Sequence, residues 1–306
     1  MWRFRAPATI LLFAVLAPAH AATDGLPGSA SPLCRNPRLP SQVPGLGPAP
    51  VANVSCVGVR PGGVAEVGGG ICTLNVLFRG SDGRRYIGTA GHCVIDEFDA
   101  PQEHAWKTGK GPPAYLPDLV SLGIEEGLGL SPVGSAATAI EMGRHRFGEA
   151  AYAFYADVNR FGQDFALIRL DPGIPYSPAV CYWGGPTGVY ADVSESDFPT
   201  PSDLIVMRLF GHGQAVGALP ARTIIGLVPV SAYMAAAWGP DNFGDSGSPV
   251  ILEDGRSVGV LVGFGPTSLD PAQLAPVAIV RLGPAVARAE KVMGIKLTLL
   301  KAPLAP

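Results

Sequence analysis

Residues 71–93 read ICTLNVLFRGSDGRRYIGTAGHC and contain two apolar runs separated by a short polar segment. The runs at 71–78 and 85–90 are rich in β-branched and aromatic residues, which favour strands. Between them lies Gly80-Ser81-Asp82-Gly83, a composition typical of tight turns. The stretch therefore predicts a β-hairpin.

The rest of the chain continues this pattern of short strands. Charged residues make up only 15% of the chain, whereas Gly (40) and Pro (31) are abundant, which favours strands and turns over long solvent-facing helices. Residues 94–150 are poor in strand signal and predict surface loops. Residues 284–293, followed by Gly294, predict one short C-terminal helix. We expect an all-β barrel or sandwich with further strands at 151–157, 165–170, 204–210, 223–230, 249–252, 258–264 and 277–282.

The N-terminus has the parts of an export signal. Two arginines precede an apolar run at residues 10–17, and Ala19-His20-Ala21 has the small-x-small pattern of a cleavage site. The run is much shorter than the roughly 20 residues of a membrane span. We therefore expect 1–21 to be a signal peptide and the mature protein to be secreted, extracellular or periplasmic, with no membrane segment. Residues 22–65, which begin with a Gly- and Pro-rich stretch, indicate an arm or short propeptide.

Charge and metal-ligand spacing exclude other classes of partner. The formal net charge is -3, so no basic surface for nucleic acid is expected. Histidines 104, 145 and 212 lack metal-ligand spacing with a cysteine or a second histidine, so no zinc site is predicted. The acidic residues at 96, 97 and 99 are interpreted as a solvated loop, because calcium needs six or more oxygen ligands. We expect a monomer without metal or cofactor.

Three separate stretches contain the residues of a nucleophilic hydrolase. Ser246 lies in Gly244-Asp245-Ser246-Gly247-Ser248-Pro249, where flanking glycines let backbone N–H groups approach a substrate carbonyl. His92 ends the second apolar run, and histidine is the best general base near neutral pH. Asp164 opens an apolar strand and can orient an imidazole. Each residue alone has an ordinary explanation, as a turn serine, a core histidine or an exposed aspartate, so the combination carries the prediction.

The motifs Thr89-Ala90-Gly91-His92-Cys93, Asp164-Phe165-Ala166-Leu167-Ile168-Arg169-Leu170 and Gly244-Asp245-Ser246-Gly247-Ser248-Pro249 resemble, in this order, the signatures of chymotrypsin-like serine proteases. The resemblance spans roughly residues 66–295 and implies two packed six-stranded antiparallel β-barrels with the catalytic residues in the cleft between them. It implies a triad of His92, Asp164 and Ser246, with the N–H groups of Gly244 and Ser246 as the oxyanion hole. The protease domain is then expected at 66–306, with barrel one at about 66–175, barrel two at about 200–282 and the helix at about 284–293.

Chain order argues against two other classes of serine hydrolase. An α/β-hydrolase has its histidine after the serine, but the last histidine here is His212. A subtilisin-like order needs an aspartate well before His92, and only Asp24 and Asp82 are available.

Export makes disulfides the first interpretation of the five cysteines. The resemblance implies a Cys72–Cys93 bridge beside the histidine. Cys181 is expected to pair with Cys56 or Cys34, and we favour Cys56; the odd count leaves one cysteine over. The chain departs from the family pattern at Ser248, where glycine is usual. The partner of Asp245 is either a freshly cut N-terminus or an internal arginine.

The primary specificity pocket is expected between residues 237–243 and the Gly263-Phe264-Gly265 strand. Pro240 aligns with the position at which trypsin-like enzymes carry an acid. If Asp241 points into the pocket floor, cleavage after Lys or Arg is expected; otherwise a small or apolar residue is preferred. The function expected is a secreted serine endopeptidase acting on protein or peptide substrates. The alternatives are a catalytically silent binding protein of the same fold and a hydrolase of small esters.

Overall fold

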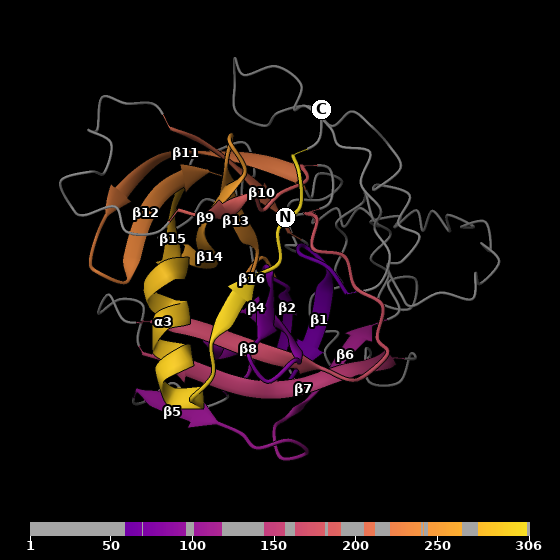
Figure 1. The fold of residues 1–306 in the computed structure, drawn as a ribbon. Helices are drawn as coiled ribbons and strands as arrows, with labels where there is room; N and C mark the ends of the chain where they lie inside the picture. The colour runs from indigo at the N-terminus through magenta and orange to yellow at the C-terminus, as the bar shows by residue number, and fades with distance from the viewer. Residues whose placement is uncertain are drawn as a thin grey trace, which may run out of the picture.

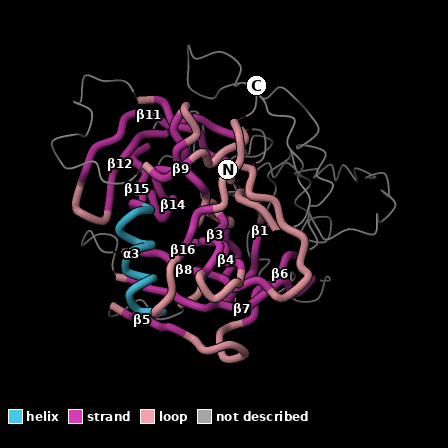
Figure 2. The backbone as a smooth tube through the Cα atoms, viewed as in Figure 1, coloured by secondary structure: helices cyan, strands magenta, loops and turns pink. Residues whose placement is uncertain are grey.

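The computed structural model describes residues 59–68, 70–95, 101–117, 144–156, 163–180, 183–190, 205–211, 221–239, 241, 244–264 and 275–304. Over these residues the chain forms two mainly antiparallel sheets and one α-helix (Figures 1 and 2). The all-β fold class and the C-terminal helix are therefore confirmed. No helix in the described part of the chain is long and apolar enough to cross a bilayer.

The first sheet has nine strands and contains the predicted hairpin as β3 and β4. The apolar run at 71–78 is divided between β2 and β3, since Leu74 donates its N–H to Gly63 outside the sheet register. The strands follow the order β16 (Leu297–Leu299), β3 (Leu77–Gly80), β4 (Arg85–Thr89), β8 (Asp164–Leu170), β7 (Arg144–Tyr155), β6 (Pro113–Pro117), β1 (Val64–Val67) and β2 (Gly70–Thr73), and β5 (Gln102–Ala105) pairs with β7.

This first sheet is a half-barrel beside the closed barrel of the second sheet, and the expected fold class is confirmed. Strand β16 pairs antiparallel with β3 on the edge that does not face β4, and β2 continues into β3 through residues 74–76, of which Asn75 and Val76 bond to Gly88 of β4. The C-terminal residues thus return to the first sheet after the helix. At the other end of the chain, β1 begins at Val64 and an isolated bridge joins Val59 to Tyr176, so the described structure starts before residue 66.

The second sheet contains a closed ring of six strands. Pairing of β13 (Pro249–Leu252) with β14 (Arg256–Phe264) closes the ring. The ring consists of β13 (Pro249–Leu252), β10 (Val206–Phe210), β11 (Ala221–Pro229), β12 (Met234–Gly239), β15 (Ala275–Arg281) and β14 (Arg256–Phe264), and a short parallel strand, β9 (Gly188–Val189), adds to β14.

All seven further strand predictions correspond to strands, with ends that shift by up to seven residues. Strands β1, β5, β6, β9, β12 and β16 were missed, and of these β5, β6 and β12 lack β-branched residues. Strand β12 is alanine-rich and is held by pairing with β11 on one side and β15 on the other. Tertiary pairing overrides weak local strand preference there. Strands β5 and β6 lie within 94–150, which was predicted as loop.

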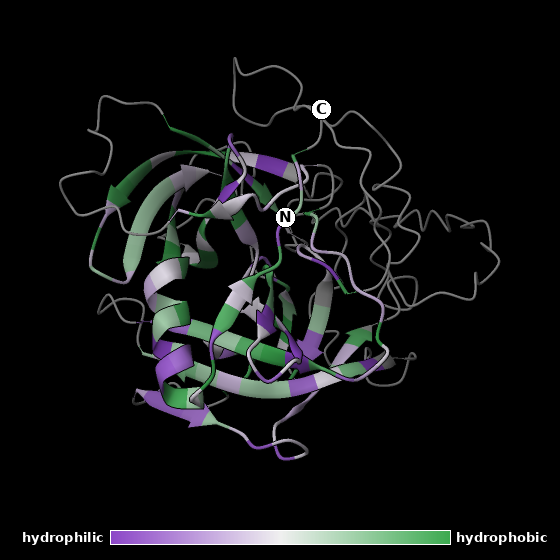
Figure 3. Ribbon diagram, in the orientation of Figure 1, coloured by the Kyte–Doolittle hydropathy of each residue, from purple (hydrophilic) through white to green (hydrophobic). Residues whose placement is uncertain are grey.

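Helix α3 (Leu282–Met293) contains the predicted helix, begins two residues before it and ends at Gly294 in the left-handed conformation, with φ of 69°. Its buried face is formed by Leu282, Ala285 and Ala289. These residues belong to a cluster that also contains Cys93 of the first sheet and Val262 of the second. Figure 3 shows the helix beside both sheets, with apolar residues on the strands that it covers. The apolar contact between the two sheets thus lies next to the predicted site.

Candidate active site

His92 lies on a 3-10 turn, η1 (Gly91–Cys93), that directly follows β4. A Cβ atom at Gly91 would lie 2.1 Å from the carbonyl oxygen of Phe154, so only glycine fits before the histidine. Strands β4 and β8 pair antiparallel with Thr89 opposite Ala166, and this register places Asp164, the first residue of β8, under the turn. The predicted Thr-Ala-Gly-His-Cys motif thus follows from a close backbone contact.

Two hydrogen bonds join His92 to Asp164. The imidazole Nδ1 lies 2.6 Å from Oδ2, and the backbone N–H of His92 donates to Oδ1 at 2.8 Å. The carboxylate is fully buried, while the imidazole is 24% exposed. Because a carboxylate only accepts, Nδ1 carries a proton and Nε2 is free to act as a base.

Burial lowers the pKa of His92, but the charge of Asp164 and its hydrogen bond raise it by more. The net effect is a pKa above the ordinary value of 6.5. An imidazolium formed during a reaction is therefore stabilised by this environment.

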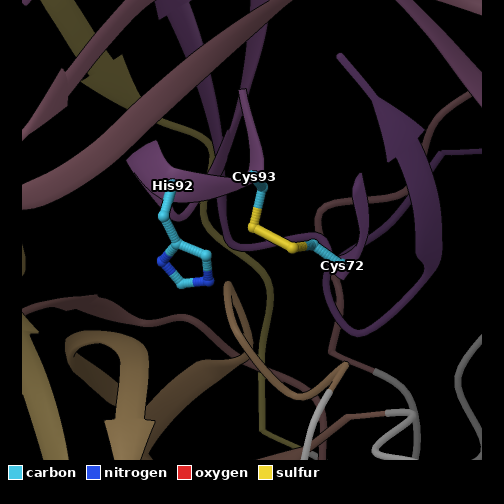
Figure 4. Close-up of side chains that lie close together, drawn as sticks. All are labelled: Cys72, His92 and Cys93. Atoms are coloured by element: carbon cyan, nitrogen blue, oxygen red, sulfur yellow. A yellow bond between two sulfur atoms is a disulfide. The ribbon is translucent and has the colours of Figure 1, made fainter. Parts of the chain in front are cut away.

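The Cys72–Cys93 disulfide lies beside the imidazole (Figure 4). The ligand atoms of Cys72, Cys93 and His92 are within 4.8 Å of one another, a spacing that also suits a metal ion. Both sulfur atoms are committed to the disulfide and offer no thiolate, so this group is not a metal site.

The loop with Ser246 is attached directly to the end of β2. The carbonyl oxygen of Ser246 accepts the N–H of Thr73 at 2.8 Å, and Thr73 follows Cys72 of the disulfide. A Cβ at Gly247, where φ is 97°, would lie 1.9 Å from the carbonyl oxygen of Thr73. Ser246 is thus brought to the same region as His92 through Thr73 and the disulfide. Within the described residues, His92 is hydrogen-bonded to Asp164 but not to Ser246.

Asp245 is paired with an internal arginine. Arg222 on β11 donates from both terminal nitrogens to the two carboxylate oxygens, with Nη1 to Oδ2 at 2.6 Å, and both side chains are fully buried. A Cβ at Gly211 would lie 2.5 Å from Asp245 Oδ1, so the end of β10 must be glycine for the pair to fit. Of the two partners that the sequence left open, the structure has the internal arginine.

Comparison with known proteins adds a likeness of fold. No family model and no curated protein matches the sequence. Thermobifida fusca protease A is 13% identical with a TM-score of 0.47, and covers 79% of this chain and 99% of its own. A glutamic acid-specific serine protease is 16% identical with a TM-score of 0.41 (78% and 100% covered), and a Nocardiopsis protease is 14% identical with a TM-score of 0.43 (78% and 98%). The chain resembles chymotrypsin-like serine proteases. At these identities and TM-scores the likeness carries no argument about this chain.

The expected specificity pocket is described in part. Gly263 and Phe264 lie at the end of β14, and a Cβ at Gly263 would meet no atom of the described residues within 4 Å. Pro240 and Gly265 lie outside the described residues, as do residues 1–58 with the signal peptide, Cys34 and Cys56, and also Cys181, His212 and the acidic residues at 96, 97 and 99.

Asp241 has a buried carboxyl group with no hydrogen-bond partner among the described residues. Burial and the nearby charge of Asp245 raise its pKa to about 8, although Arg222 acts in the opposite direction. The group is therefore close to the buried ion pair behind the Ser246 loop. This placement suits a carboxyl that is neutral at pH 7.

Sequence reasoning did not find Thr73 and Asn75, which bond the Ser246 loop. Both side chains are fully buried, although they lie in an apolar run beside Leu74 and Val76. Isolated polar residues in such a run signal buried hydrogen bonds, because an unpaired polar group there is costly. That signal says nothing about which distant segment supplies the partner.

Proposed function

We propose that the chain is a serine endopeptidase in which Ser246 is the nucleophile, His92 the general base and Asp164 the group that orients the base. The observation that carries this proposal is the doubly hydrogen-bonded pair of His92 with the fully buried Asp164. Because His92 is held through Nδ1, its Nε2 is free to take the proton of Ser246 when a substrate is bound. Hydrogen bonds between such groups often tighten only when substrate binds.

In the proposed reaction, Ser246 Oγ attacks the scissile carbonyl carbon while His92 Nε2 takes its proton. The oxyanion of the tetrahedral intermediate accepts the N–H groups of Gly244 and Ser246. His92 then gives the proton to the leaving amine as the C–N bond breaks, which leaves an acyl-enzyme. Water, deprotonated by His92, releases the acid and restores the serine.

The buried Arg222–Asp245 pair supports an activation route without a new N-terminus. The negative charge next to Ser246 is already balanced, so no cut is needed to supply a positive amine. We propose that residues 1–21 are removed on export and that the protease domain occupies 66–306. The Cys72–Cys93 disulfide is compatible with an oxidising compartment.

A fluorophosphonate probe tests the nucleophile. Labelling of wild type that is lost in Ser246→Ala and strongly slowed in His92→Ala supports the proposal, whereas folded protein that does not label supports a silent binding protein. Initial rates on matched peptide and ester substrates separate a peptidase from a small-ester hydrolase. Profiling on a mixed peptide library determines the preference, with Lys or Arg expected if Asp241 faces the pocket and small or apolar residues otherwise.

A further inference from the structure

The peptide groups of the Ser246 loop are held by hydrogen bonds from outside the loop. The carbonyl oxygen of Gly244 accepts the Thr73 hydroxyl at 2.7 Å, and that of Ser246 accepts the Thr73 N–H at 2.8 Å. The N–H of Gly247 donates to Leu261 at 2.7 Å. Asn75 Nδ2 lies 2.9 Å from the carbonyl oxygen of Gly247. The first sheet thus supplies three of these contacts.

The Gly244–Asp245 peptide lies between the two N–H groups of the proposed oxyanion hole. Its carbonyl belongs to Gly244, whose φ of 96° is accessible to glycine and strained for other residues. A glycine here also has alternative conformations of similar energy, so local sequence alone does not hold this peptide in one orientation. The Thr73 hydroxyl is the side-chain donor that fixes its carbonyl.

Rotation of this peptide would break the hydrogen bond between the Thr73 hydroxyl and the Gly244 carbonyl oxygen. Because Thr73 is buried, water has little access to replace that bond. Thr73 is fully buried, and its own carbonyl oxygen is held by the Thr89 hydroxyl at 2.9 Å. The donor is therefore itself fixed in position. Donors fixed in advance stabilise a developing charge without reorganising during the reaction.

We propose that Thr73 is a positioning residue whose hydroxyl keeps the oxyanion loop in its productive orientation. The inference rests on the proposed function and names a residue of the first sheet that acts through Gly244. Asn75 supports the following turn of the loop through Gly247. Thr73 touches no reacting atom in this account; its effect passes through the direction of the Gly244 and Ser246 N–H groups.

The test compares Thr73→Val, which keeps the shape and loses the hydroxyl, with Thr73→Ser, which keeps the hydroxyl. We expect Thr73→Val to lower kcat by roughly 10- to 100-fold with little change in KM, because a displaced donor fails mainly in the transition state. Thr73→Ser should retain most of kcat. A peptide aldehyde, which forms a tetrahedral adduct, should bind Thr73→Val more weakly, while the matching product peptide binds as to wild type.

Thr187→Val is the control, since it also removes a threonine hydroxyl from a backbone carbonyl, that of Asp254, and leaves the hydrogen bonds of the Ser246 loop in place. This variant should keep most of kcat. If Thr73→Val does not fold, Thr73→Ala is measured against Thr73→Ser in the same way. All rates are taken on protein whose folding is verified by a cooperative thermal transition.

Three outcomes overturn the inference, and one of them also overturns the proposed function. If wild type labels with the fluorophosphonate and Thr73→Val turns over at the wild-type rate, the positioning role is wrong and the proposed function stands. The same holds if Thr73→Ser is as slow as Thr73→Val. If folded wild type neither labels nor cleaves, the proposed function fails and this inference with it.

Discussion

Removing Arg222 should destabilise the protein much more than removing an exposed arginine from an ion pair. Arg222 and Asp245 are both fully buried and share two hydrogen bonds. Arg222→Met keeps a similar volume and leaves the Asp245 carboxylate buried without its counter-charge. Loss of one partner from a buried pair costs about 3–5 kcal/mol. The charge of Asp245 also contributes to the raised pKa of the nearby Asp241.

Urea unfolding followed by tryptophan fluorescence measures this cost. With a urea dependence of about 2–3 kcal/mol per molar, the midpoint should fall by about 1 to 2.5 M. The matched control is Arg256→Met, which breaks the Arg256–Asp254 pair at 2.7 Å, in which the two side chains are 47% and 51% exposed. Exposed pairs contribute about 0–1 kcal/mol, so this variant should stay near wild type.

The reasoning is refuted if the two variants unfold at the same urea concentration with unchanged slopes. Arg222→Lys gives a further check, because it restores the charge without the two-pronged contact and should recover only part of the loss. Folded Arg222→Met should also label more slowly with a fluorophosphonate, since Asp245 lies between Gly244 and Ser246.

Three other predictions concern pH and the disulfide. Asp241 has a pKa of about 8 in the folded protein and its ordinary 3.8 in the unfolded chain, so the free energy of unfolding should fall by about 1.4 kcal/mol per pH unit between these values. Urea titrations at several pH values should show this pH dependence in wild type and not in Asp241→Asn; equal pH dependence in the two proteins would contradict the account. Because the pKa of His92 is raised and its neutral form is the base, the acid limb of kcat/KM should lie above pH 6.5, and Asp164→Asn should move it lower; a wild-type limb below 6.5 speaks against the pairing. Replacing Cys72 and Cys93 by alanine removes a link between residues 21 apart in sequence and should lower the free energy of unfolding by about 3 kcal/mol relative to oxidised wild type. Reduced wild type should be destabilised by the same amount.

Local sequence was sufficient to predict most of the strands and the helix. The strand at 249–252 is found at the predicted residues, and the helix ends at the predicted glycine. Alternating apolar residues, turn glycines and helix-ending glycine act over a few residues, so their effects are visible in one stretch of chain. The strand β12 has no such pattern, and its pairing with β11 and β15 forms it.

For the candidate site, too, some features follow from local sequence and others depend on tertiary packing. From local motifs alone, Ser246, His92 and Asp164 could be predicted as nucleophile, base and orienting acid. The neighbouring Gly91 and Gly247 make close backbone contacts that no side chain permits. The three-dimensional packing was needed to show that Arg222 partners Asp245, that the buried Asp241 carboxyl has no hydrogen-bond partner among the described residues, and that the Thr73 hydroxyl holds Gly244, 171 residues away. Such contacts depend on how two sheets pack against each other, and a polar side chain carries no local signal of the distant group that will satisfy it.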